Sequence, residues 1–307
     1  MHTWTWIPIV LFAALAQTAR NAAQREISEQ AGPVGATLTR FLYGLPFSLL
    51  FLFAVASTTR SPLAAPTFTV TYFFWLLLGA AAQIAGTAFL LLAMRKRNFV
   101  VAVTYSKTEV VQVAVLGFAF LGDELSAVAV LAIAIVIAGV SLLSVQVAGP
   151  RREFTAWVGS AAVYGVGAGL MLAIATVGYR GAGLELLQGG GVGSPWLVGA
   201  WGVVLAQSFQ ALVLVGWLSV RERSALLSVL RAWRVSMAAG VAGAAASIAW
   251  FTGFALQTAA HVRTLGMVEV LFSYAISRGF LLEKVTTTEK IGLVLVVLGA
   301  ILSSVSL

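Results

Sequence analysis

Long apolar segments, separated by short polar or charged connections, fill most of this sequence. The stretches Ser61–Met94 and Leu125–Pro150 contain no charged residue. A helix that crosses a bilayer needs about 20 mostly apolar residues. On that criterion the pattern predicts ten spanning helices, at Trp4–Gln24, Val34–Ser57, Tyr72–Met94, Val100–Leu121, Leu125–Val147, Thr155–Arg180, Pro195–Val220, Val235–Gln257, Val262–Leu282 and Thr287–Val305. We expect helices because backbone N–H and C=O groups in lipid must find hydrogen-bond partners within their own segment.

The composition indicates an integral membrane protein. Hydrophobic residues make up 60% of the chain and charged residues 10%, whereas a soluble domain carries about 25% charged residues. We therefore expect an all-α, multi-pass protein of the cell membrane, which in a bacterium would be the inner membrane. The chain has no cysteine and two histidines, too few for a histidine-based metal cluster, so we expect neither a metal nor another cofactor. The net charge of +8 is explained by topology signals and lipid head groups, so no nucleic-acid partner is expected.

Basic residues concentrate in every second connection between the predicted helices. The connections after the first, third, fifth, seventh and ninth helices hold Arg25; Arg95, Lys96 and Arg97; Arg151 and Arg152; Arg221, Arg223, Arg231 and Arg234; and Lys284 and Lys290. The other connections hold little more than Arg60. Short cytoplasmic loops carry an excess of lysine and arginine, so the pattern predicts that both termini lie outside the cytoplasm.

An internal repeat relates the two halves of the chain at a constant offset of 160 residues. Its matched pairs include Arg20 with Arg180, Glu109 with Glu269, Val110 with Val270, Gly139 with Gly299, Leu142 with Leu302 and Ser144 with Ser304. Charged residues are rare in this chain, so the arginine and glutamate matches weigh more than the apolar ones. Five helices per half is an odd number, so the second half enters the membrane from the opposite side. The chain is thus predicted to be an inverted-topology repeat of residues 1–147 and 148–307, an arrangement typical of secondary transporters; chance similarity of two hydrophobic halves is the alternative.

The stretches Leu116–Ser144 and Ile276–Ser304 each contain a short acidic turn followed by a glycine-containing helix. With the five-plus-five layout of the whole chain, they resemble the drug/metabolite transporter (DMT) superfamily, in its EamA-like branch. The resemblance implies a transporter fold around a central cavity, usually an exporter of small metabolites, amino acids or drugs. Many members carry a proline midway along the fourth and ninth helices. This chain has none there and has Glu109 and Glu269 nearby instead.

Polar residues within the predicted helices form the candidate site. A polar side chain in a membrane helix is costly in lipid and is expected to face protein or water. On the first, fourth and ninth helices these residues recur at spacings of three or four, which places them on one helical face. We predict that they line one polar cavity with substrate-binding residues Gln17, Arg20, Gln24, Tyr105, Glu109, Gln112, Arg180, Trp250, Glu269 and Ser273.

The leading hypothesis is a secondary active transporter that works by alternating access, with the two halves rocking around a cavity near the membrane midplane. An arginine could hold the carboxylate of an amino acid or another amphipathic substrate, and a glutamate its ammonium group. Glu109 and Glu269 could also take up and release protons and so couple export to a proton gradient.

Other interpretations stay open on the sequence alone. Glu109 and Glu269 could form buried structural ion pairs with Arg20 or Arg180. A flippase for a lipid or lipid-linked head group would suit the same fold. No metal triad, nucleophile pair or phosphate-binding loop is visible, so an enzyme is not expected. One chain already holds both halves of the repeat, so a monomer would suffice, and we expect a monomer or a homodimer bound to a small-molecule substrate.

Overall fold

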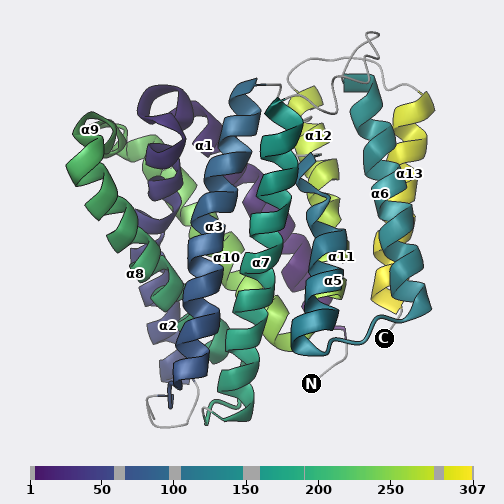
Figure 1. The fold of residues 1–307 in the computed structure, drawn as a ribbon, viewed down its shortest axis with the longest axis horizontal. Coiled ribbons are helices and arrows are strands. Elements are labelled where there is room, and N and C mark those ends of the chain that lie inside the picture. The colour runs from purple at the N-terminus through teal and green to yellow at the C-terminus, as the bar shows by residue number, and fades with distance from the viewer. Residues whose placement is uncertain are drawn as a thin grey trace. The chain divides into compact units, whose positions relative to one another are not determined.

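The computed structural model describes residues 4–58, 66–96, 105–147, 160–189, 191–279 and 287–305. Within these ranges the chain is helical and contains no strand (Figure 1). The helices are α1 (Trp6–Leu42), α2 (Leu45–Thr58), α3 (Val70–Lys96), α5 (Glu109–Leu121), α6 (Ala127–Val147), α7 (Ser160–Gln188), α8 (Pro195–Arg221), α9 (Arg223–Arg231), α10 (Trp233–Leu256), α11 (Ala259–Leu265), the 3₁₀ helix η2 (Gly266–Val268), α12 (Glu269–Gly279) and α13 (Thr287–Val305). The prediction of an all-α fold is confirmed for the described residues.

Several helices are long and apolar enough to cross a membrane. Among the described residues there are five such segments: Trp6–Thr58, Val70–Lys96, Val163–Gln188, Pro195–Arg221 and Trp233–Leu256. Shorter apolar helices lie at Glu109–Leu121, Ala127–Leu142 and Lys290–Ser303. These segments fit a multi-pass membrane protein. The predicted boundary between the halves, at residues 147 and 148, and the basic residues Arg60, Arg97, Arg151, Arg152 and Lys284 adjoin or fall outside the described ranges.

The first two predicted helices meet at a glycine-proline pair. Helix α1 continues past Gln24, where the sequence predicted its end, and is interrupted at Gly32. Gly32 has φ 69° and ψ 172°, a left-handed φ that favours glycine because it has no Cβ. Pro33 follows and begins the next helical segment, where its fixed φ suits the first helical turn. The predicted second helix therefore corresponds to two observed segments, the end of α1 and the whole of α2. A turn at Tyr43 and Gly44 separates α1 from α2.

Contacts between Cα atoms divide the chain into two compact units. Unit 1 comprises Met1–Ile84 and Ile174–Thr258, and unit 2 comprises Ala85–Ala173 and Ala259–Leu307. Each unit therefore takes helices from both predicted halves of the repeat. In unit 1, α1 packs against α8, α9 and α10, and α2 packs against α8 and α10.

In unit 2, α6 and α13 lie side by side (Figure 1), and glycine brings their backbones close together. A Cβ atom at Gly139 would lie 2.8 Å from the carbonyl oxygen of Gly292, and one at Gly299 would lie 3.0 Å from that of Ala132. Residues 132 and 292 differ by 160, as do residues 139 and 299. The two helices thus make the same close contact twice, with their roles exchanged. Small residues permit such approach in membrane proteins, where van der Waals packing drives helix association.

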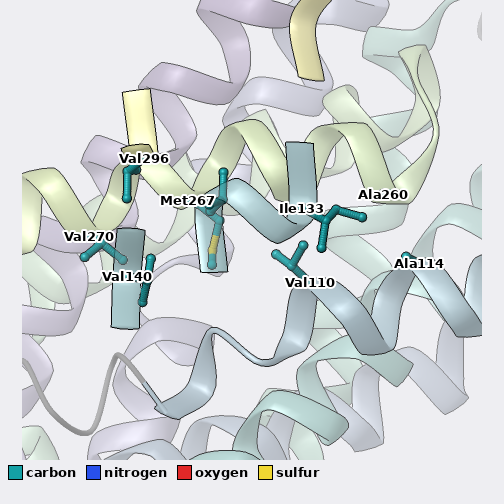
Figure 2. Close-up of a cluster of buried hydrophobic side chains, with 9 residues drawn as sticks. Val110, Ala114, Ile133, Val140, Ala260, Met267, Val270 and Val296 are labelled. Carbon is teal, nitrogen blue, oxygen red and sulfur yellow. The ribbon is translucent and has the colours of Figure 1, made fainter. Parts of the chain in front are cut away.

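A cluster of buried apolar side chains fills the interior of unit 2 (Figure 2). Its buried members are Val110, Ala114, Ile133, Val136, Val140, Ala260, Met267, Val270 and Val296. Two pairs related by the repeat offset, Val110 with Val270 and Val136 with Val296, belong to this one cluster. Val110 and Val270 directly follow Glu109 and Glu269 in the sequence, so each glutamate adjoins apolar packing.

The close contact at Gly299 predicts a measurable stability difference. We expect Gly299→Ala to lower the thermal unfolding temperature in detergent, because the new Cβ meets Val136 and the carbonyl of Ala132. Overpacking of this kind costs about 1–3 kcal/mol and outweighs the gain of about 1 kcal/mol in helix propensity. Gly216→Ala on α8 is the control, since its Cβ would meet nothing within 4 Å, and it should be neutral or stabilising. Equal unfolding temperatures for the two variants would contradict the packing argument.

Candidate functional site

Glu109 and Glu269 each stand at the first residue of a helix that follows an irregular turn. Glu109 begins α5, and the backbone N–H groups of Thr108 and Val110 donate to the carbonyls three residues earlier. Glu269 begins α12, directly after the 3₁₀ helix η2. The first N–H groups of a helix have no partner within it, and the N-terminal end of the helix dipole favours a negative charge. The two glutamates therefore occupy similar positions, each at the start of a helix that follows an irregular turn.

Two buried ion pairs cross between the segments that carry these glutamates. Lys107 Nζ donates to Glu269 Oε2 at 2.5 Å, and Arg263 Nη2 donates to Glu109 Oε2. Both glutamates are 1% exposed, and the two cations are 5% and 8% exposed. Each cation thus lies just before one glutamate in sequence and pairs with the other. All four side chains belong to unit 2.

These pairs change the sequence interpretation. The structural alternative named Arg20 or Arg180 as partners for the glutamates, whereas the cations paired with them within unit 2 are Arg263 and Lys107. The sequence places both cations inside predicted spans, but it carries no information on which side chains meet across helices. Their charge inside an apolar segment was the available signal, since a charge in a spanning helix is expected to have a partner.

Other polar groups of unit 2 lie one helical turn beyond the two glutamates. Ser273, four residues after Glu269, is 2% exposed. Its Oγ has no hydrogen-bond partner within the described residues, and neither has the buried Oε1 of Gln112, three residues after Glu109. A buried polar atom without a partner costs free energy, so these two atoms are available to a ligand that carries hydrogen-bonding groups.

Tyr105 and Asp123 have structural contacts in the same unit. Tyr105 packs against Gly165 of α7, where a Cβ would collide with the tyrosine side chain. Asp123, from the predicted acidic turn, accepts the N–H of Ala259 at the start of α11, with an N···O distance of 3.4 Å. Both residues therefore hold elements beside the ion pairs in place.

The polar stripe of the first helix is buried within unit 1. Trp250 Nε1 donates to Gln17 Oε1 at 2.9 Å, and Arg20 Nη2 donates to Asn21 Oδ1 at 2.7 Å. Gln24 Nε2 donates to the carbonyl of Ala36 at 2.7 Å, which ties together the two segments of α1 on either side of Gly32. Gln24 thus contributes to the fold, while Gln17 and Trp250 are brought together as one polar and aromatic pair.

A second arginine, Arg40, lies beside Arg20 in unit 1. A Cβ at Gly243 of α10 would lie 3.1 Å from the Cβ of Arg40 and 3.4 Å from the Cδ of Arg20. Both arginines are buried, at 3% and 4% exposure. The sequence interpretation missed Arg40, although its position inside a predicted span gave the same signal as Glu109. Arg180, also in unit 1, is half-buried and donates to the carbonyl of Phe254.

Glutamine and tyrosine side chains form another buried network in unit 1. Gln210 Nε2 donates to Gln83 Oε1 at 2.9 Å and to the Tyr179 hydroxyl at 3.1 Å, and that hydroxyl donates to Gln83 Oε1 at 2.9 Å. Tyr179 also lines a small cavity with Tyr72 and Phe251, which has room for about one water molecule. The site predicted from the sequence did not include Gln83, Tyr179 or Gln210.

The ten predicted site residues therefore divide between the two units. Unit 1 holds Gln17, Arg20, Gln24, Arg180 and Trp250, and unit 2 holds Tyr105, Glu109, Gln112, Glu269 and Ser273. Within the described residues no group of three or more histidine and acidic side chains is placed to hold a metal ion. Of the groups described above, the two crossed ion pairs of unit 2 bring together the most buried charged side chains.

Comparison with known proteins gives a similar solved structure and a family match over part of the chain. A solved crystal structure aligns with 97% of this chain and 96% of its own, with a TM-score of 0.68 and 15% sequence identity, a likeness that shows a shared fold. No curated protein gives a significant sequence match. Residues 4–145 match the model of the EamA-like transporter family, whose members move small molecules across membranes. The matched family is part of the drug/metabolite transporter superfamily, and this segment of the chain is similar to it.

Proposed function

We propose that the protein is a secondary active exporter of small zwitterionic metabolites, such as amino acids, and that Glu109 and Glu269 couple transport to protons. The observation that carries the proposal is the pair of crossed, buried ion pairs at two irregular helix starts. Discontinuous helices commonly form the substrate and ion sites of secondary transporters. The match of residues 4–145 to the EamA-like transporter family supports the broader part of the proposal, that the protein transports small molecules across a membrane.

The charges of unit 2 suit a substrate that carries both signs. A substrate ammonium group can replace Lys107 as the partner of Glu269, and a substrate carboxylate can then pair with the released lysine. The same exchange is open to Arg263 and Glu109. An exchange of partners keeps every buried charge compensated, which avoids the cost of several kcal/mol for leaving one ion alone. The unpartnered oxygens of Ser273 and Gln112 lie one helical turn away and could accept further donors of the substrate.

Protons can enter the same exchange at the glutamates. A proton bound to a glutamate oxygen cancels the carboxylate charge, and the cation that was paired with it then attracts the carboxylate of a substrate. When the proton leaves, the ion pair forms again and the substrate is released. Each transport cycle would in this way move protons as well as substrate.

The repeat supports alternating access in this protein. We extend the proposal to a ten-helix, five-plus-five inverted arrangement of residues 1–147 and 148–307 in the cell membrane. Its support is the exchanged contacts of Gly139 and Gly299, together with the two buried glutamates, which the offset of 160 relates to each other. In an inverted repeat such equivalent elements act in opposite orientations, and this allows one structure to open to either side.

The substrate class can be tested by thermal unfolding in detergent. We expect one or more of the standard amino acids to raise the unfolding temperature, and the matching amino acid amide, which lacks the carboxylate, to have no effect. A ligand at a hundred times its Kd stabilises the folded state by about 2.7 kcal/mol. Stabilisation that is equal for an amino acid and its amide would exclude recognition of the carboxylate, and a hit confined to lipid-like compounds would favour a flippase.

Proton coupling can be tested with Glu109→Gln and Glu269→Gln in proteoliposomes. With a stabilising amino acid as substrate, we expect each variant to lose uptake driven by a pH gradient, because glutamine keeps the shape of the side chain but cannot bind and release a proton. The control is Glu29→Gln, since Glu29 is exposed on α1. Gradient-driven transport at the wild-type rate in both variants and in the double variant would rule out this role.

A double substitution separates transport from structural stability. Lys107→Met alone leaves the Glu269 carboxylate buried without this cation, and such a change costs about 3–5 kcal/mol. We expect Lys107→Met with Glu269→Leu to recover most of that loss, because replacing a buried ion pair by apolar residues is often neutral or stabilising. The recovered protein should still fail to transport. Thermal unfolding and proteoliposome transport of the same samples check this, and full transport by the double variant would assign the pair a purely structural role.

A further inference from the structure

The connection between α8 and α10 is a short helix, α9 (Arg223–Arg231), whose inner face is fixed on α1 (Figure 1). Ala225 and Val229, one turn apart, are buried, and a Cβ at Gly35 of α1 would lie 3.3 Å from Val229. The carbonyl of Val229 accepts hydrogen bonds from the hydroxyls of Tyr43 and Ser236. The sequence interpretation treated this stretch as a loop that carries a topology signal.

The outer face of the same helix is apolar and exposed. Leu227 is 49% exposed and Leu230 is 46% exposed. Two tryptophans flank them: Trp217, near the end of α8, is 54% exposed, and Trp233, the first residue of α10, is 53% exposed. Tryptophan is enriched where a membrane protein leaves the hydrocarbon layer, because its ring is apolar and its N–H group is polar.

Four exposed arginines surround this apolar face. They are Arg221, Arg223, Arg231 and Arg234, and with Glu222 as the one acidic residue between 221 and 234 the stretch carries a net charge of +3 (four positive minus one negative). The guanidinium of Arg221 lies 5.7 Å from the centre of the Trp217 ring, and that of Arg234 lies 5.4 Å from the centre of the Trp233 ring. These distances are within the range of a cation–π interaction, which places each positive charge beside an aromatic ring.

The lengths of the neighbouring helices fix where α9 lies with respect to a bilayer. Helices α8 and α10 are both long and apolar enough to cross a membrane, and residues 222–232 are all that separates them. The connection therefore cannot extend far from the level at which the two helices leave the hydrocarbon. At that level the molecules beside exposed leucine, tryptophan and arginine side chains are phospholipids and their head groups. An amphipathic helix of this composition lies in the interface and is attracted to anionic lipids.

We propose that α9 and the adjoining ends of α8 and α10 form a binding surface for the head groups of anionic phospholipids. The leucines and tryptophans enter the boundary of the acyl chains, and the arginines contact the phosphates. The excess of arginine also predicts that this end of unit 1 faces the cytoplasm, and the cytoplasmic leaflet is the one that carries anionic lipid in many membranes. This surface is independent of the transport chemistry proposed for unit 2.

The test measures thermal unfolding of the full chain in detergent with added phosphatidylglycerol, phosphatidylcholine or inorganic phosphate. We expect phosphatidylglycerol to raise the unfolding temperature more than phosphatidylcholine, and inorganic phosphate to have little effect. The variant Arg223→Gln/Arg231→Gln/Arg234→Gln should lose the additional stabilisation by phosphatidylglycerol and keep the wild-type unfolding temperature in phosphatidylcholine. The single variants should each lose part of the effect, which keeps the test decisive if the triple variant does not fold.

A matched control removes the same charge elsewhere. In Arg25→Gln/Arg95→Gln/Lys96→Gln three other exposed cations are replaced, and the response to phosphatidylglycerol should be retained. An equal loss in this control would show a general effect of positive charge and overturn the proposal. Equal stabilisation by the two lipids, or by inorganic phosphate alone, would overturn it as well.

Discussion

The energetic cost of a carboxylate in an apolar interior is the constraint on which unit 2 depends. Glu109 and Glu269 are nearly inaccessible, and each precedes a valine of the buried apolar cluster. An ion removed from water loses several kcal/mol of hydration, and only a close opposite charge with further hydrogen-bond donors offsets that loss. Lys107 and Arg263 supply the charge, and the N-terminal ends of α5 and α12 contribute a helix dipole that favours a negative charge.

Close packing elsewhere in the unit holds these charges in register. Helices α6 and α13 approach at two glycines, and each glycine faces a backbone carbonyl of the other helix. In lipid there is little hydrophobic force between helices, so such van der Waals contacts determine which helices associate. The same offset of 160 relates the glycines, the carbonyls they face and the two glutamates. The repeat offset of 160 therefore relates equivalent positions both in the helix packing and in the charged site.

The sequence predicted the all-helical character because length and hydropathy alone decide whether a segment can satisfy its backbone in lipid. It also singled out Glu109 and Glu269, since charge is rare in this chain. It did not predict where helices are interrupted: the irregular turns before α5 and α12 contain no proline, and they are shaped by tertiary contacts. The partners Lys107 and Arg263 were missed because the repeat offset relates equivalent positions and not positions in contact. Helix α9 was missed because a nine-residue amphipathic helix lies below the length criterion for a span.

The crossed arrangement of the ion pairs gives a reason for the presence of charged side chains in the apolar interior of unit 2. If they served stability alone, apolar side chains of similar size would do as well or better, since buried ion pairs contribute little net free energy. What a charged pair offers, and an apolar pair does not, is a state that changes when a proton or a charged ligand arrives. Because Lys107 pairs with Glu269 and Arg263 with Glu109, a change at either glutamate releases a cation attached to the segment that carries the other. The two sites are thereby linked through the backbone between each cation and its neighbouring glutamate. In the proposed inverted repeat this linkage would join two equivalent sites of opposite orientation, and the release of one would be transmitted to the other within unit 2.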